Sequence, residues 1–477
     1  MSGCRIEIWP DRPTATVSPL IYGHNAELVG RGVYEGIWVG PRSKIPNEGG
    51  LRLDVLAALK QLRAPILRWP GSCTIDGYHW RDGIGNPKDR PQTVSVWARQ
   101  VEPNTFGTDE FIRLCAAVGC EPYLGMNAGT GTIQEALDWL EYCNFGGESG
   151  LSHLRQSHGG AKPYGVRYWS VGGGCWQYAG RPSAAEYARH FVKMASFMRG
   201  LDPNVQIVAS GWDGEGGGES WNHDFASAMP HEDLIDHLSI HRYFSRGHGV
   251  EFDDDDYHGL FDDLRALERD IQQTEHVLRY FYPNKRVGIA VDEWGLRHPC
   301  AVPENGLEQA NSLRDAVFAG AALNLFNRYA HCISMTNIVQ AMNSLQCLAV
   351  TGGARMHLTP TYHVYDMMRP HMGARLLLHE MESEALSVSA TLQDHRILLT
   401  VANQTLDQDV ETRVELAGVK QGHIIGRILN AASARDGNSF ESPKTVSPKR
   451  FRFDFTGSEF AHTFPAHSFT ALTITPE

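Results

Sequence analysis

Eight short apolar segments alternate with longer amphipathic segments between about residue 18 and residue 340, and this alternation constrains the fold more than any other feature. The short segments are rich in Val, Ile, Tyr and Trp, which is typical of buried strands. They are 20–25, 66–70, 121–127, 166–172, 205–212, 236–244, 286–294 and 332–340. Helical patterns are clear at 53–62, 108–119, 131–144, 183–201, 261–281 and 307–330, and weak after 205–212. Eight βα units in series predict a (β/α)8 TIM barrel.

A doubly wound open sheet is the alternative that this alternation allows. Such sheets usually carry a glycine-rich phosphate loop after an early strand, and neither GxGxxG nor a Walker loop follows any of the eight segments. We therefore favour the barrel. In a barrel, functional side chains come from the C-terminal ends of the strands.

The pattern changes after Pro360, where short alternating segments are separated by Gly, Asn, Asp and Pro. This spacing predicts an antiparallel β-sandwich. The opening run CRIEIWP has the same character and can pair into that sheet. We therefore expect a barrel over 18–360 and a sandwich domain built from 1–17 together with 361–477.

Composition argues against several classes of partner. The 477 residues include 43 Lys and Arg against 55 Asp and Glu, a net charge of -12, without a long basic run. Nucleic acid and anionic membranes both require clustered positive charge, so we expect neither as a partner. The N-terminus lacks a secretory pattern and the most apolar helical stretch, 316–326, is too short to span a membrane, so we expect a soluble, cytoplasmic protein.

Cysteine and histidine spacing gives no sign of a metal or cofactor. The nine cysteines form no CxxC pair, the 22 histidines are scattered, and no HExxH motif is present. We expect reduced thiols, no metal and no cofactor.

Polar side chains concentrate at the predicted strand ends. Glu293 ends the seventh strand, His241 and Tyr243 lie on one face at the end of the sixth, and Arg68 and Gln340 belong to the second and eighth. Carboxylate, guanidinium, amide and aromatic groups together are typical of a sugar site. The alternative is structural: Glu293 as the ion-pair partner of Arg68, and His241 and Tyr243 as satisfied polar core residues.

The motifs resemble the intracellular α-L-arabinofuranosidases of glycoside hydrolase family 51. The similar segments include IYGHNAELVGRGVYEGIWVG, LRWPGSCTIDGYHWRDGIG, NTFGTDEFIRLC, VDEWG, NSLRDAVFAGAALNLFN and LTPTYHVYDM. The resemblance implies a retaining glycosidase with a nucleophile at the end of strand seven and an acid/base Glu at the end of strand four. It also implies a carbohydrate substrate and a homo-oligomer.

By this resemblance Glu293 matches the nucleophile, and four residues hold the sugar or orient the nucleophile: Glu27, Arg68, Tyr243 and Gln340. Further candidate sugar contacts at the strand ends are Cys73, Asn127, Gly173, Trp176 and His241.

The strand-four segment YWSVGGGCW departs from the family pattern of Gly-Asn-Glu. Gly173 stands at the Asn and Gly174 at the acid/base Glu, so the acid/base position has no carboxyl group. A retaining glycosidase needs a second carboxyl to protonate the departing oxygen and then to deprotonate water. Gly174 can do neither.

Three interpretations remain open. The first is an enzyme with an altered substrate or a relocated acid, for which Asp213, Glu215, His223 and Cys175 are the candidates. The second is a non-catalytic carbohydrate-binding or regulatory homologue. The third is an engineered variant of an ordinary arabinofuranosidase.

Overall fold

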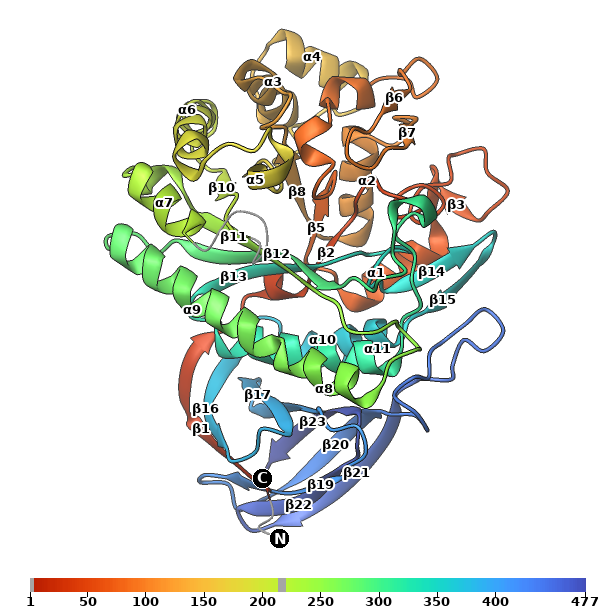
Figure 1. The fold of residues 1–477 in the computed structure, drawn as a ribbon, viewed down its shortest axis with the longest axis vertical. Coiled ribbons are helices and arrows are strands. Elements are labelled where there is room, and N and C mark those ends of the chain that lie inside the picture. The colour runs from red at the N-terminus through yellow and green to blue at the C-terminus, as the bar shows by residue number, and fades with distance from the viewer. Residues whose placement is uncertain (1–3, 213–219) are drawn as a thin grey trace.

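The computed structural model describes residues 4–212 and 220–477 (Figure 1). Eight parallel strands close into a barrel in chain order, and each overlaps a segment that the sequence predicts to be a strand, although the seventh extends two residues beyond its segment. They are β2 (Gly23–Asn25), β5 (Ile66–Trp69), β8 (Glu121–Met126), β9 (Tyr168–Val171), β10 (Gln206–Ala209), β11 (His237–Phe244), β12 (Gly288–Leu296) and β13 (Ile333–Ile338). The predicted TIM barrel is confirmed.

Helices surround the barrel between the strands. They are α1 (Leu53–Leu62), α2 (Thr108–Val118), α3 (Ile133–Asn144), α4 (Gly150–Ser157), α5 (Cys175–Tyr178), α6 (Ala184–Leu201), α7 (Trp221–Ala228), α8 (Asp254–Asp262), α9 (Leu264–Phe281), α10 (Leu313–Arg328) and α11 (Pro360–Met368). A capping box formed by Ser183 and Glu186 starts α6, as its sequence indicates. The helix expected over 261–281 is α9, preceded by the separate helix α8, and α4 and α11 carry no clear sequence signal.

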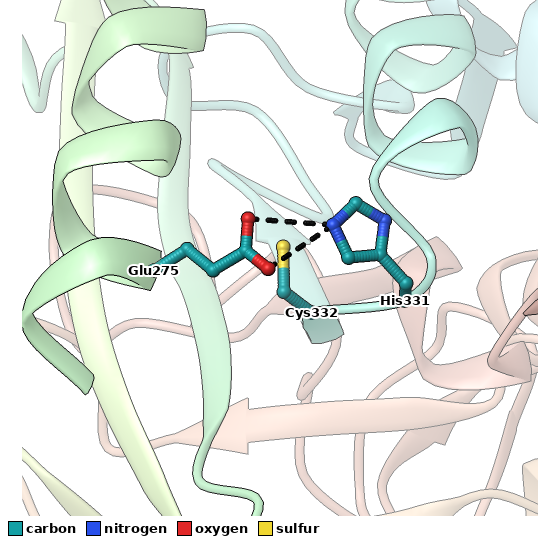
Figure 2. A group of neighbouring side chains, drawn as sticks. All are labelled: Glu275, His331 and Cys332. Carbon is teal, nitrogen blue, oxygen red and sulfur yellow. Dashed lines mark hydrogen bonds and ion pairs between the residues drawn. The ribbon is translucent and has the colours of Figure 1, made fainter. Parts of the chain in front are cut away.

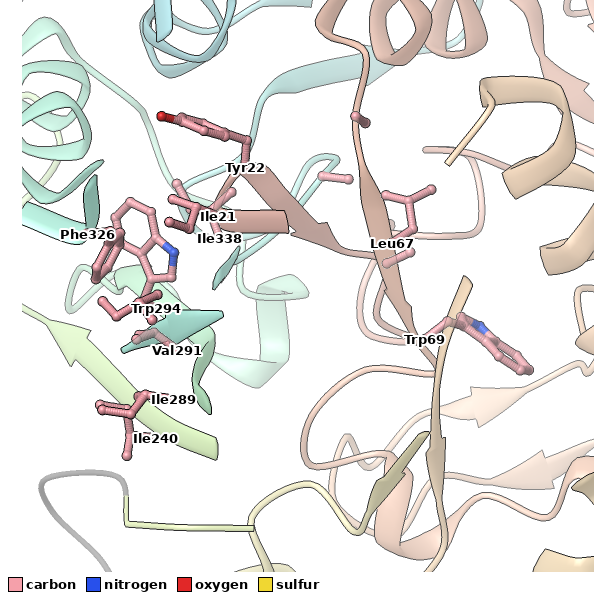
Figure 3. Close-up of a cluster of buried hydrophobic side chains, with 14 of the residues drawn as sticks. Ile21, Tyr22, Leu67, Trp69, Ile240, Ile289, Val291, Trp294, Phe326 and Ile338 are labelled. Carbon is pink, nitrogen blue, oxygen red and sulfur yellow. The ribbon is translucent and has the colours of Figure 1, made fainter. Parts of the chain in front are cut away.

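The main hydrophobic core lies between the barrel strands and these helices (Figure 3). Trp69 stacks on Phe111 with ring centroids 5.4 Å apart, and Trp294 meets Phe326 edge-on at 5.0 Å. Successive side chains of a strand point to opposite faces. Because Trp69 points outward, Arg68 points into the barrel.

A nine-stranded sheet forms the second part of the molecule, below the barrel in Figure 1, in the order β21-β20-β23-β18-β17-β16-β1-β19-β22. Its strands are β1 (Cys4–Thr16), β16 (Arg375–Met381), β17 (Leu386–Gln393), β18 (Arg396–Asn403), β19 (Val410–Leu416), β20 (Gln421–Leu429), β21 (Lys449–Thr456), β22 (Glu459–Phe464) and β23 (Ser468–Pro476). β21 and β22 are consecutive in the chain yet form opposite edges, and Phe453 meets Phe460 across them at 5.6 Å. The sheet therefore folds around its own hydrophobic core.

The N-terminal strand β1 lies inside this sheet, as the sequence indicates. It pairs antiparallel with β16 and parallel with β19, so the sheet is mixed rather than antiparallel throughout. α10 connects the two parts of the molecule, because Asn324 donates to the carbonyl oxygen of Ser387 at 2.8 Å and accepts from the hydroxyl of Thr400 at 2.7 Å.

Three two-stranded sheets complete the described structure: β3 (Asn47–Glu48) with β4 (Leu51–Arg52), β6 (Thr93–Val94) with β7 (Val101–Glu102), and β14 (Ala349–Gly352) with β15 (Arg355–Leu358). Within the described ranges, no helix has the length and apolar character needed to cross a membrane.

Candidate active site

Glu293 is the centre of a buried polar cluster at the C-terminal end of β12, where it is 3% exposed. The hydroxyl of Tyr243 donates a short hydrogen bond to Oε1 of Glu293. Nη1 of Arg68 donates to Oε2 at 3.2 Å, and Nδ1 of His241 lies 3.5 Å from the same oxygen. Both carboxylate oxygens are thus held by the barrel.

An extra residue in β12 brings Glu293 into this position. Opposite Ser239 and His241 of β11, which are two residues apart, β12 places Ala290 and Glu293, which are three apart. Strand alternation alone would turn Asp292 inward and Glu293 outward. The irregularity lets both acids face the barrel interior before Trp294 turns outward, as β-bulges commonly do beside active sites.

Asp292 anchors the cluster from below. It accepts hydrogen bonds from Tyr123 at 2.6 Å and from Ser239, and it lies 3.4 Å from Nε of Arg68 and 3.2 Å from Nε2 of His241. Burial would raise the pKa of Asp292, but the charges of Arg68 and His241 outweigh burial and hold that pKa below its ordinary value. Asp292 is therefore a charged support for the groups that hold Glu293.

Glu27 is a second buried carboxyl, just after β2. Its Oε1 accepts from the backbone N–H of Ser72 at 2.9 Å and from the thiol of Cys73 at 3.6 Å, and its Oε2 accepts from Gln340 at 2.7 Å. Burial, reinforced by the charge of Glu293, raises the pKa of Glu27 to about 7. At neutral pH this group can therefore both donate and accept hydrogen bonds.

His241 and Trp176 form the next part of the cluster. Their ring centroids lie 5.4 Å apart, and both side chains are buried. Burial would lower the pKa of His241, but the charges of Glu293 and Asp292 outweigh burial and raise that pKa above its ordinary value. The structure thus brings together most of the predicted sugar contacts: Glu27, Arg68, Cys73, Trp176, His241, Tyr243 and Gln340.

The two glycines of the strand-four loop differ in the space around them. A β-carbon built on Gly173 would lie 2.3 Å from the carbonyl oxygen of Ser72. This clash is not easily relieved, because the oxygen belongs to the backbone. A β-carbon on Gly174 would meet ring carbons of Tyr178 at 3.0 and 3.2 Å and of Trp176 at 3.3 Å. Packing therefore requires glycine at 173, whereas position 174 has narrow room for a side chain.

Two further residues at this loop were not singled out by the sequence analysis. Asp76 is buried behind the loop and accepts from the backbone N–H groups of Gly173 and Ala128, both at 3.1 Å, and burial raises its pKa to about 6. Tyr178 packs its ring on Gly174 and lies 5.2 Å from the ring of Trp97. Its position four residues after Gly174, one helical turn, was the signal available in the sequence.

The other sequence candidates lie elsewhere. Asn127 uses its amide within its own loop and toward the loop after β5: it donates to Thr130 and to the carbonyl oxygen of Tyr78, and its oxygen accepts from the N–H groups of Gly129 and Thr130. Of the candidates for a relocated acid, His223 and Cys175 are described and Asp213 and Glu215 lie outside the described residues.

Neither described candidate is placed to replace the acid. His223 is exposed on α7, where it contacts Asp224 at 3.1 Å and packs on Phe281 of the outer helix α9. Cys175 is fully buried and its thiol donates to the carbonyl oxygen of Val171, and burial raises its pKa well above the ordinary value. These contacts give no support to either side chain as a relocated acid, and both remain predictions from the sequence.

Comparison with known proteins places this arrangement in a family. Residues 58–258 match the family described as Alpha-L-arabinofuranosidase 1 domain, and residues 292–468 match the Alpha-L-arabinofuranosidase C-terminal domain. The chain is 34% identical to an intracellular exo-alpha-L-arabinofuranosidase of Bacteroides ovatus, over 94% of this chain and 90% of that protein.

Solved structures agree with these sequence matches. The GH51 arabinofuranosidase of Xanthomonas axonopodis pv. citri superposes with a TM-score of 0.94 at 30% identity, over 99% of this chain and 100% of that one. The α-L-arabinofuranosidase of Thermotoga maritima in its arabinose complex superposes with a TM-score of 0.88 at 29% identity, over 98% and 99% of the two chains. The barrel, the buried carboxylates at its strand ends and these matches all agree. The chain belongs to glycoside hydrolase family 51, a family of α-L-arabinofuranosidases.

Proposed function

We propose that the protein hydrolyses α-L-arabinofuranosides with retention of configuration, using Glu293 as the nucleophile and no acid/base carboxyl at position 174. The observation that carries this proposal is the position of Glu293, whose two carboxylate oxygens are held by Tyr243 and Arg68 at the end of a barrel strand. The names of the relatives supply the substrate class, and that of the Bacteroides ovatus relative further suggests removal of terminal arabinofuranose units.

The first step forms a bond between a carboxylate oxygen of Glu293 and the anomeric carbon, while the bond from that carbon to the departing oxygen breaks. The electron pair of the broken bond stays on the departing oxygen. Without a proton donor at position 174, that oxygen leaves as an anion. The step therefore favours leaving groups that are weak bases, such as the phenolates of acidic phenols.

The second step needs a water molecule to attack the anomeric carbon and release Glu293. A base at position 174 would normally take the proton of that water; Gly174 cannot, so the proton passes to solvent water. The glycosyl-enzyme is therefore the species that we expect to accumulate. Water, or an added anion small enough to approach, releases the sugar slowly.

Tyr178 partly fills the space beside Gly174, and we propose that it contributes to the first step alone. Burial, together with the negative charges of Glu293 and Glu27, raises the pKa of its phenol above the ordinary value. A phenol that stays protonated can donate a hydrogen bond to a departing oxygen but cannot accept a proton from water. Tyr178 therefore partly substitutes for an acid and not for a base.

The test compares purified protein with its Glu293→Gln variant on 4-nitrophenyl α-L-arabinofuranoside. We expect slow but measurable release of nitrophenol, and none from the variant. Mass spectrometry of the quenched reaction should find one arabinosyl unit on the peptide that contains Glu293. If neither turnover nor the labelled peptide is seen, with or without azide, the non-catalytic carbohydrate-binding alternative replaces this proposal.

Three further properties are proposed on the family relationship. We propose a homo-oligomer, which light scattering of the purified protein tests. We propose a cytoplasmic location, because one relative is described as intracellular, and cell fractionation tests it. We also retain 18–360 and 1–17 with 361–477 as the domain limits, which limited proteolysis tests.

A further inference from the structure

A second cluster of ligand-type side chains consists of Glu275, His331 and Cys332 (Figure 2), and it lies at the opposite end of the barrel strands from Glu293. Glu275 belongs to α9, and His331 and Cys332 immediately precede β13, so the cluster stands at the N-terminal end of that strand. Its three side chains converge in Figure 2, with His331 between the carboxylate and the backbone of the turn. Active sites of (β/α)8 barrels lie at the other, C-terminal end of the strands.

The distances suit a small metal ion. Nε2 of His331 lies 3.2 and 3.3 Å from the two carboxylate oxygens of Glu275, and the donor atoms of all three residues lie within 4.8 Å of one another. Around a tetrahedral zinc ion with bonds of about 2.0 to 2.3 Å, neighbouring donor atoms are roughly 3.3 to 3.8 Å apart. The nitrogen and oxygen are already close to this spacing, and the sulfur lies within 4.8 Å of both.

The donor types select the ion. One thiolate, one imidazole and one carboxylate form a mixed sulfur, nitrogen and oxygen set, which suits Zn²⁺ and not Mg²⁺ or Ca²⁺. A cavity of about 400 Å³ borders all three residues and leaves room for a fourth ligand. We propose that Glu275, His331 and Cys332 bind one Zn²⁺ ion that ties α9 to the start of β13, with water or a small anion as the fourth ligand.

Two arginines contact the cluster. Arg279 pairs with Oε1 of Glu275 at 2.8 Å, and Arg286 donates to the backbone carbonyl of His331. Zinc binding therefore frees Arg279 from Glu275 and releases the thiol proton of Cys332 to solvent. The remaining positive charge around the site favours a small anion over water as the fourth ligand.

Titration of the metal-free protein with Zn²⁺ in a chelator-competition assay measures the site. We expect one ion bound per chain, and a dissociation constant raised about tenfold or more in Cys332→Ser and in Glu275→Gln, since even outer-shell losses at zinc sites cost that much. Cys300→Ser and His276→Ala are matched controls, because both residues are exposed and lie outside the cluster. They should bind Zn²⁺ as the unaltered protein does.

Co²⁺ gives a second readout that does not depend on activity. A thiolate bound to Co²⁺ produces a sulfur-to-metal absorption band in the near ultraviolet, which should be present in the protein and in Cys300→Ser and absent from Cys332→Ser. Zn²⁺ should also raise the melting temperature of the unaltered protein and not that of Cys332→Ser. Less than one ion per chain, or equal binding by Cys332→Ser and the controls, would overturn the proposal and assign the metal to scattered surface histidines.

Discussion

The carbonyl oxygen of Ser72 lies 2.3 Å from the point where a β-carbon on residue 173 would stand, so the loop after β9 closes on the loop after β5 more tightly than any side chain at 173 permits. At Gly174 the obstructing atoms belong to the rings of Tyr178 and Trp176 instead. Restoring the usual family pair of Asn and Glu would therefore meet backbone at the first position and movable side chains at the second.

This difference predicts unequal costs for two matched substitutions. Gly173→Ala should lower the free energy of unfolding by about 1 to 3 kcal/mol, the usual range for overpacking. Gly174→Ala should lower it by about 1 kcal/mol or less, because its backbone is not in the left-handed region and alanine reduces the entropy of the unfolded chain. Urea unfolding followed by tryptophan fluorescence measures both, and equal losses would show that Ser72 does not restrict residue 173.

The rate should depend steeply on the leaving group. General acid catalysis contributes about 10²- to 10⁴-fold, and its loss is felt most by groups that are strong bases. We expect 4-nitrophenyl arabinofuranoside to be cleaved and methyl arabinofuranoside to be cleaved at least about a hundredfold more slowly. A series of aryl arabinofuranosides measures the slope of log kcat/KM against leaving-group pKa, and a flat slope would show that another group donates the proton.

Azide or formate should accelerate release of the sugar from Glu293 and yield the glycosyl azide or formate ester. Because the ring of Tyr178 packs on Gly174, the acceleration should be larger in Tyr178→Ala than in Tyr178→Phe, which keeps the ring. Product analysis by mass spectrometry distinguishes the glycosyl azide from free arabinose. Acceleration that is the same in both variants would place the anion somewhere other than beside Gly174.

Gly174→Glu should supply part of the missing acid catalysis, so that methyl arabinofuranoside is cleaved at least about tenfold faster than by the unaltered protein. The ring of Tyr178 must yield by a few tenths of an ångström to admit the β-carbon of the new side chain. Gly174→Gln is the matched control, since it has the same size and cannot deliver a proton. If Gly174→Gln raised the rate equally, filled space and not proton transfer would be the cause.

Glu27 should make the protein less stable as the pH rises through neutrality. Its pKa is raised in the folded state to about 7, against about 4.3 for an unperturbed glutamate, so its stabilising contribution is complete below the lower value and lost as pH rises through the upper one. A single group changes the free energy of unfolding by up to about 1.4 kcal/mol per pH unit.

Urea unfolding between pH 4.5 and about 8 in Glu27→Gln should therefore show a shallower decline than in the unaltered protein. Glu148→Gln, at a side chain that is 93% exposed, is the control and should leave the decline unchanged. Parallel curves for all three proteins would mean that Glu27 ionises normally in the fold.

The barrel could be predicted because its signals are local. Each of the eight strands has its own apolar run, and alternation within β5 already turns Arg68 inward opposite Trp69. Glu293 is different, since strict alternation from Ala290 would turn it outward. Family resemblance identified this residue. The extra residue in β12 that turns it inward is defined only by pairing with β11, so it produces no recognisable local pattern in the sequence.

The loop around Gly173 could not be read from the sequence for a similar reason. Three glycines indicate freedom, but the contact of Gly173 with Ser72 and the bonds from Asp76 join segments about a hundred residues apart. Tyr178 was within reach of a helical spacing argument. His223 and Cys175 are side chains that can transfer protons. Only the structure shows that His223 packs on Phe281 and that the thiol of Cys175 donates to the carbonyl oxygen of Val171.

Because β1 lies between β16 and β19, it can pair fully only after both of those strands have been synthesised. Strand β1 is synthesised before the barrel strands and has no partner until residues 375–381 and 410–416 have been made, by which time all eight barrel strands have been synthesised. The newborn N-terminal segment must therefore remain unpaired while the barrel assembles. A bulky fusion at the first residue would travel with that waiting strand, and the finished sheet would have to close around it.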